Sequence, residues 1–120
     1  MALTEERENR LGMLAVRTAR RNGAWVVSLE GELDLANADV AEGALREASE
    51  DESMSLVVDM QELTFIDSTG IALLVSLMRS ERCRGRLSFV PSTAPEVVRV
   101  LQVTGIEERL VGAKPDFAHE

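Results

Sequence analysis

Short apolar runs separated by polar turns make up most of this 120-residue chain. Residues 13–20 alternate partly between apolar and polar side chains, and residues 25–30 are rich in residue types that favour strands. Between them lies Asn22-Gly23, a dipeptide that favours a two-residue hairpin turn because both residues tolerate a positive φ. The pattern therefore predicts an antiparallel hairpin near the N-terminus.

Helical and strand patterns alternate after this hairpin. Apolar residues recur at helical spacing over 36–49 and 71–78, and a third helix over 93–103 opens with the capping box Thr-Ala-Pro-Glu. Residues 56–60 and 86–90 are short apolar runs typical of buried strands. The order β-β-α-β-α-β-α predicts parallel strands joined by right-handed crossovers. We expect a single-domain α/β fold, with a mixed sheet of four or five strands and three or four helices.

Both ends of the chain are polar. Residues 1–10 and 112–120 are expected to be flexible termini, which leaves residues 11–111 as the folded domain, with a short edge element over 106–111. The longest apolar run, residues 71–75, is far shorter than the roughly 20 residues that a membrane span requires. Since the N-terminal residues also lack the apolar stretch of a signal peptide, we expect a cytoplasmic protein without membrane attachment.

Composition narrows the range of functions. With 13 basic and 21 acidic residues the net charge is −8, which disfavours direct binding to nucleic acid. A single cysteine, Cys83, and a single histidine, His119, leave zinc sites and histidine-dependent catalysis without their usual residues. Residues 30–52 hold nine acids and one base, which indicates either a solvated helix face with a loop or an acidic docking surface. We expect a binding module that is not an enzyme and holds no metal or cofactor.

The most informative segment is residues 63–73, between a predicted buried strand and a predicted helix. Open α/β sheets place their ligand sites at such carboxyl ends of strands. Asp67, Ser68 and Thr69 are good N-cap residues, and the glycine that follows them allows a tight turn, so a capped helix start is one interpretation. The other is a phosphorylation site. The unpaired N–H groups and dipole at a helix N-terminus stabilise a phosphate, and its charge of about −1.5 to −2 would repel a docked partner.

Three segments resemble motifs of the STAS domain of bacterial anti-sigma factor antagonists. Asp67-Ser68-Thr69-Gly70 ahead of an apolar helix is similar to the phosphorylation motif of that family. Gly-Glu-Leu-Asp at residues 31–34 resembles its second signature, and residues 101–106, which end in Thr-Gly-Ile, resemble its last helix and closing turn. The motifs occur in the family's order, and the resemblance spans about residues 11–111.

This resemblance implies a partner-switching function. In the family, the unphosphorylated protein binds an anti-sigma factor, which is also an ATP-dependent serine kinase of the histidine-kinase-like type, and the sigma factor is released. The kinase then phosphorylates the motif serine, and a serine phosphatase restores it. By position, Ser68 would be the phosphoacceptor. The implied partner-binding residues are Asp34, Asp67, Thr69 and Gly70, of which Thr69 departs from the pattern by supplying a second hydroxyl.

Two other interpretations stay open at this point. The chain could be a STAS subunit of another assembly, such as a lipid-transport complex or a stress-sensing scaffold, and Ser68 would then have no effect on a sigma factor. It could also be an enzyme or a nucleotide-binding domain in which Asp59 and Asp67 imitate a phosphoacceptor site. The chain has no G-x-x-x-x-G-K loop and no histidine base, which disfavours the latter.

Overall fold

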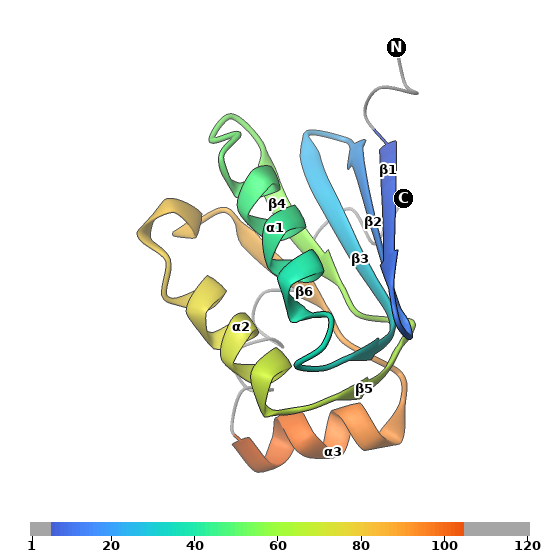
Figure 1. Ribbon diagram of the computed structural model, residues 1–120. Coiled ribbons are helices and arrows are strands. Elements are labelled where there is room, and N and C mark those ends of the chain that lie inside the picture. The colour runs from blue at the N-terminus through green and yellow to red at the C-terminus, as the bar shows by residue number, and fades with distance from the viewer. Residues whose placement is uncertain (1–5, 105–120) are drawn as a thin grey trace.

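Strands and helices alternate along residues 6–104, the part of the chain that the computed structural model describes (Figure 1). The strands are β1 (Glu6–Leu11), β2 (Leu14–Arg21), β3 (Ala24–Leu33), β4 (Ser55–Asp59), β5 (Leu63–Ile66) and β6 (Leu87–Val90). The helices are α1 (Ala38–Ser49), α2 (Ser68–Met78) and α3 (Pro95–Thr104), with the short 3₁₀ helix η2 (Glu81–Cys83) before β6. The predicted mixed α/β fold is confirmed, with six strands where four or five were expected.

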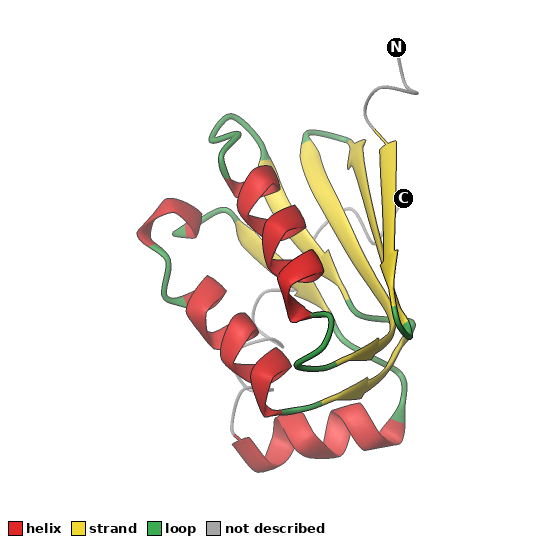
Figure 2. Ribbon diagram, in the orientation of Figure 1, coloured by secondary structure: helices red, strands yellow, loops and turns green. Residues whose placement is uncertain are grey.

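The six strands form one sheet. Five of them lie in the order β1-β2-β3-β4-β6, and β5 pairs with the last residues of β3, beyond the part that pairs with β4. β1, β2 and β3 are antiparallel neighbours, whereas β4 and β5 run parallel to β3, and β6 runs parallel to β4. The predicted hairpin is confirmed as β2 and β3, whose turn holds Asn22 at φ 52° and Gly23 at φ 80°. Figure 2 shows α1 and α2 on one face of this sheet.

Strand β1 differs from the sequence prediction, which assigned residues 1–10 to a flexible terminus. It pairs with β2 along its whole length although all six of its residues are exposed. Ladder hydrogen bonds hold it, together with exposed ion pairs such as Arg7–Glu47 at 2.8 Å. An edge strand of this kind buries no apolar face, so a hydrophobic pattern does not reveal it. The edge element predicted over 106–111 and the flexible terminus predicted over 112–120 lie outside the described residues.

Strand β5 is the second difference, because its four residues were interpreted as a loop leading into a helix. It pairs in parallel with the last residues of β3, where Gly31 lies opposite Leu63 and Leu33 lies opposite Ile66. The first half of β3, from Ala24 to Ser28, pairs with β4 instead. β4 and β5 therefore lie one after the other along the same edge of β3, with only residues 60–62 between them.

The main core lies between the sheet and the helices α1 and α2. Alternate side chains of the three central strands point into it and are almost fully buried: Leu14, Val16, Val27, Leu29, Leu56 and Val58. Helix α1 turns a row of alanines and Leu45 towards the sheet, and these small side chains bring the helix close to it. Because burial of one Leu or Val side chain contributes about 1.5–3 kcal/mol, this layer holds the helices in place.

The start of α3 differs from the predicted capping box. The hydroxyl of Thr93 donates a hydrogen bond to the carbonyl of Gln61 at 3.3 Å. Ser92, which is buried, accepts from the N–H of Ala94 at 2.9 Å and donates to the carbonyl of Leu63 at 2.7 Å. These two hydroxyls join the start of α3 to the segment around β5. Such contacts between distant segments do not follow from the local sequence pattern.

Gly31 stands where the neighbour of β3 changes from β4 to β5. Its φ is +100°, a bulge follows it, and a Cβ atom there would overlap the carbonyl oxygen of Met13. Hydrogen bonds fix the backbone on both sides, from Gly31 N–H to the Glu62 carbonyl at 3.0 Å and from Glu32 N–H to the Met13 carbonyl at 2.9 Å. Glycine is required here by both its backbone conformation and the close approach of the turn between β1 and β2.

We therefore expect Gly31→Ala to lower the free energy of unfolding by at least about 2 kcal/mol, since backbone strain alone costs about 1–3 kcal/mol. Urea denaturation followed by circular dichroism measures this loss. Gly43→Ala is the matched control, because Gly43 lies in α1 with open space for a methyl group, and helix propensity makes that change neutral or stabilising. Equal stabilities of the two variants would contradict the role assigned to Gly31.

Candidate functional site

The predicted site residues gather at one edge of the sheet because β3 and β5 are parallel neighbours. Leu33 and Ile66 are paired, so the residues that follow them, Asp34 and Asp67, leave the sheet side by side. The N–H of Asp67 donates to the Leu33 carbonyl at 3.2 Å, which continues the pairing into the loops. The structure thus places Asp34 beside the Asp67-Ser68-Thr69-Gly70 motif.

The carboxylate of Asp67 joins the loop after β3 to helix α2. Its Oδ1 accepts from the N–H of Gly70 at 3.0 Å, which makes it the N-cap of α2. Its Oδ2 accepts from the N–H of Leu35 at 3.1 Å. Both oxygens are therefore engaged within the chain, and Asp67 positions two segments relative to each other.

The loop after β3 is held by its own side chains. Asp34 is half-buried, and its Oδ1 accepts from the N–H of Ala36 at 3.0 Å. Asn37 is only 1% exposed; its Oδ1 accepts from the N–H of Asp34 at 2.9 Å, and its Nδ2 donates to the Glu32 carbonyl at 2.9 Å. Asn37 stands at the N-cap position of α1, but its side chain bonds back to this loop. Its role as an organiser of the site was not predicted.

Ser68 is the first residue of α2, and its side chain is exposed. Within residues 6–104 the Ser68 hydroxyl makes no hydrogen bond, whereas Thr69 beside it is half-buried. The first N–H groups of a helix have no intrahelical acceptor, and the helix dipole is positive at this end. Ser68 is therefore the more accessible of the two hydroxyls and lies where added negative charge is tolerated.

Gly70 is needed for packing. A Cβ atom at Gly70 would lie 2.7 Å from Cγ1 of Ile66 and 2.9 Å from Cγ of Leu33, and both of those side chains are buried. The sequence interpretation, a tight turn into the helix, is wrong for this residue, because Gly70 lies inside α2 and is not among the positive-φ residues. Its missing side chain lets the first turn of α2 lie directly on the two strands.

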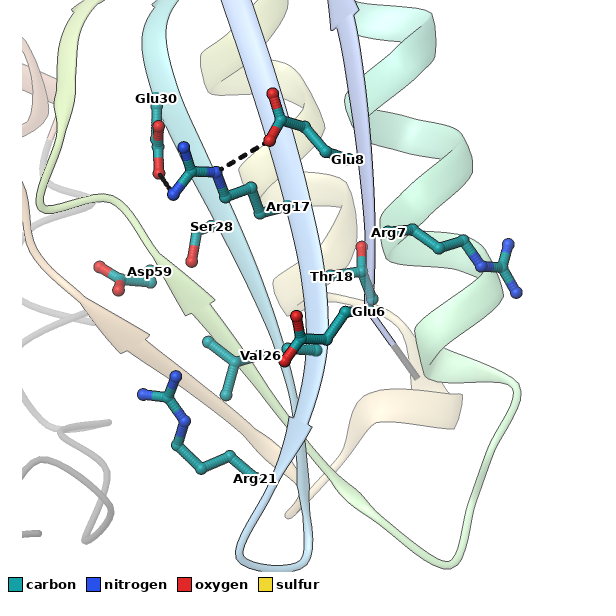
Figure 3. Close-up of a pocket in the computed structure, with 11 residues that line it drawn as sticks. Glu6, Arg7, Glu8, Arg17, Thr18, Arg21, Val26, Ser28, Glu30 and Asp59 are labelled. Carbon is teal, nitrogen blue, oxygen red and sulfur yellow. Dashed lines mark hydrogen bonds and ion pairs between the residues drawn. The ribbon is translucent and has the colours of Figure 1, made fainter. Parts of the chain in front are cut away.

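A separate cleft of about 540 Å³ lies on the sheet face opposite the main core (Figure 3). Charged side chains dominate its lining and pair with one another, as Arg17 does with Glu8 at 3.2 Å and with Glu30 at 3.5 Å. Asp59 lines this cleft whereas Asp67 does not, and each carboxylate accepts hydrogen bonds from its own neighbours, Gln61 for Asp59 and the N–H groups of Leu35 and Gly70 for Asp67. None of the five predicted site residues belongs to the cleft.

Two kinds of feature are absent from residues 6–104. This part of the chain contains no group of three or more His, Cys, Asp or Glu side chains placed to hold a metal ion. It also contains no helix with the length and apolar character needed to cross a membrane.

A family model for the STAS domain matches residues 15–118. The chain belongs to the STAS domain family. The match begins within β2 and includes the whole candidate site. The resemblance seen in the sequence motifs is thereby confirmed at the level of the family.

Individual STAS relatives are more distant. The chain is 21% identical over 95 residues to the anti-sigma-B factor antagonist of Staphylococcus aureus, covering 79% of this chain and 88% of the relative. The crystal structure of an anti-sigma factor antagonist from Mycobacterium paratuberculosis aligns with a TM-score of 0.70 at 23% identity, covering 81% and 82% of the two chains. The structure of the anti-sigma factor antagonist SpoIIAA in its unphosphorylated form aligns with a TM-score of 0.63 at 22% identity, covering 76% and 81%.

The double role of Asp67 leads to a stability prediction. Asp67→Ala should lower the free energy of unfolding by about 1–2 kcal/mol, because an N-cap is lost and Leu35 loses its acceptor. Asp67→Ser should lower the free energy of unfolding by less than half of that amount. A serine hydroxyl still caps α2 but is too short to reach the N–H of Leu35. Urea denaturation of the three proteins measures the difference. Equal losses in both variants would show that the cap is not the stabilising contact.

Proposed function

We propose that this STAS protein is an anti-sigma factor antagonist that is switched by phosphorylation of Ser68. Its unphosphorylated form binds an anti-sigma factor, and a sigma factor is released as a result. The observation that carries this proposal is an exposed hydroxyl on the first residue of α2, next to the Asp34 loop at the carboxyl edge of the sheet. The names of the relatives, which are anti-sigma factor antagonists, support it.

The switch requires two enzymes that act on this protein. A serine kinase, which we propose is the anti-sigma factor itself, transfers the γ-phosphoryl group of ATP to Oγ of Ser68. The hydroxyl proton leaves, and ADP is the second product. A serine phosphatase then hydrolyses the phosphoester and restores the hydroxyl. The protein itself contributes a binding surface and an acceptor atom and catalyses neither step.

The local charges support an off-switch. A phosphate adds about −1.5 to −2 charges to a corner that already holds the carboxylates of Asp34 and Asp67. Within the free protein the start of α2 tolerates this charge, because helix N–H groups point towards it. A docked partner without a cation at this position would instead bury it. A shift from 99% bound to 1% bound takes about 5.5 kcal/mol, which burial of an unpaired phosphate is able to supply.

We expect Ser68→Ala to bind the anti-sigma factor with the affinity of the unmodified protein and to take up no phosphate. Ser68→Glu should bind at least about tenfold more weakly, which corresponds to about 1.4 kcal/mol. A pull-down with the unphosphorylated and phosphorylated chain identifies the partner, and calorimetry with the purified partner gives the affinities. Incubation of the protein with the kinase and ATP, followed by mass spectrometry, identifies the residue that carries the phosphate.

Two controls are available. Ser55→Ala removes an exposed serine at the start of β4, at the end of the sheet opposite the site, and should change neither binding nor phosphorylation. Thr69→Ala should leave phosphate uptake intact. If Ser68→Ala is labelled as well as the unmodified protein, the assignment of the phosphoacceptor is wrong. If the chain instead co-purifies with a transport or stress-sensing complex that Ser68 variants do not disturb, it is a STAS subunit of that assembly.

A further inference from the structure

Leu35 is an exposed apolar side chain on a rigid loop beside Ser68. It is 76% exposed, although a leucine loses free energy when it faces water. Its N–H donates to Asp67, the residue that also caps the helix bearing Ser68. The buried side chain of Asn37 fixes the loop from the other side. The backbone of Leu35 is therefore held in one position relative to the start of α2 before any partner arrives.

Helix α2 presents an uncharged surface next to this loop. None of its eleven residues is charged, and only Gly70, Leu74 and Leu77 are buried. Ser68, Ala72 and Ser76, which are spaced four residues apart, are exposed and form one stripe of small side chains. The solvent-facing side of a surface helix normally carries charged residues, and α2 has none there. Its small exposed side chains allow a partner to approach the helix closely.

The charged border of this surface differs between its two ends. At the end next to the loop it is acidic, since Asp39 and Glu42 in the first turns of α1 are exposed and Asp34 is half-exposed. At the other end the exposed side chains of Arg46 and Arg79 lie beside the α2 stripe. An uncharged centre with a charged border is typical of a protein interface. The end next to the loop is complementary to a partner with an apolar pocket and a basic border.

We infer that Leu35 is the central anchor of the partner interface and inserts into an apolar pocket, bordered by lysine or arginine, on the anti-sigma factor. This inference rests on the proposed function and names the contact that gives it affinity. An interface that phosphate on Ser68 disrupts must cover Ser68, and a stable interface buries about 800 Å² on each partner. An area of this size centred on Ser68 reaches the loop that Asp67 holds next to the start of α2. Asp67 acts as a positioning residue in this interface, because it fixes Leu35 and the start of α2 together.

Paired substitutions of Leu35 test the anchor. Leu35→Asn keeps about the same size but makes the side chain polar, and we expect about thirtyfold weaker binding or more, as for an interface anchor. Leu35→Met keeps an apolar side chain of similar volume and should bind within about threefold of the unmodified protein. Both variants should unfold at the same urea concentration as the unmodified protein, because the side chain is exposed.

Asp67→Ser tests the positioning role, since it keeps the cap of α2 and loses the bond to Leu35. We expect weaker binding from this variant with a faster dissociation rate. Higher salt should slow the association of every variant, because the charges around Leu35 steer the partner.

The outcomes separate the two proposals. If phosphorylation blocks binding of the anti-sigma factor but Leu35→Asn binds as well as the unmodified protein, the role of Leu35 as an anchor is wrong and the proposed function stands. If neither phosphorylation nor Ser68→Glu affects binding, the proposed function itself is wrong, whatever the Leu35 variants do. Analytical ultracentrifugation of the protein alone adds a third outcome. A dimer that Leu35→Asn dissociates would show that a second copy of this chain occupies the surface, which overturns the inference.

Discussion

The position of the candidate site depends on β3 changing its neighbour at Gly31. Before this residue the strand pairs with β4, and after it with β5, so α2 starts from a strand adjacent to the loop after β3. The backbone makes this change with a positive φ and with the carbonyl of Met13 against Gly31, where a side chain would not fit. If β4 continued along the whole of β3, the helix that bears Ser68 would begin elsewhere.

Asp67 transmits this arrangement to the surface. One oxygen caps α2 and the other holds the loop, so the backbone at Leu35 and the first turn of α2, which begins at Ser68, have fixed relative positions. Gly70 contributes by letting the first turn of α2 rest on Leu33 and Ile66. A surface that is ordered before binding loses less conformational entropy when a partner docks.

The candidate site could be predicted from sequence because its motif is local. Asp67 to Gly70 are consecutive, and the capping preference of Asp67 follows from its chemistry alone. Asn37 could not be found in this way, since its partners are backbone groups whose approach depends on the loop. The strands β1 and β5 were missed for a related reason. One buries no side chain, and the other has four residues whose partner lies about thirty residues earlier in the chain.

The sequence by itself determined the alternation of strands and helices, the hairpin at Asn22-Gly23 and the identity of the exposed-site motif. These follow from side-chain periodicity and from turn and cap preferences, which act over a few residues. Only the tertiary structure decided that Gly70 serves packing and that both oxygens of Asp67 are used within the chain. It also decided that Leu35 stands beside Ser68. Such contacts join segments that are far apart in the sequence, and they form only when the strands beneath them pair.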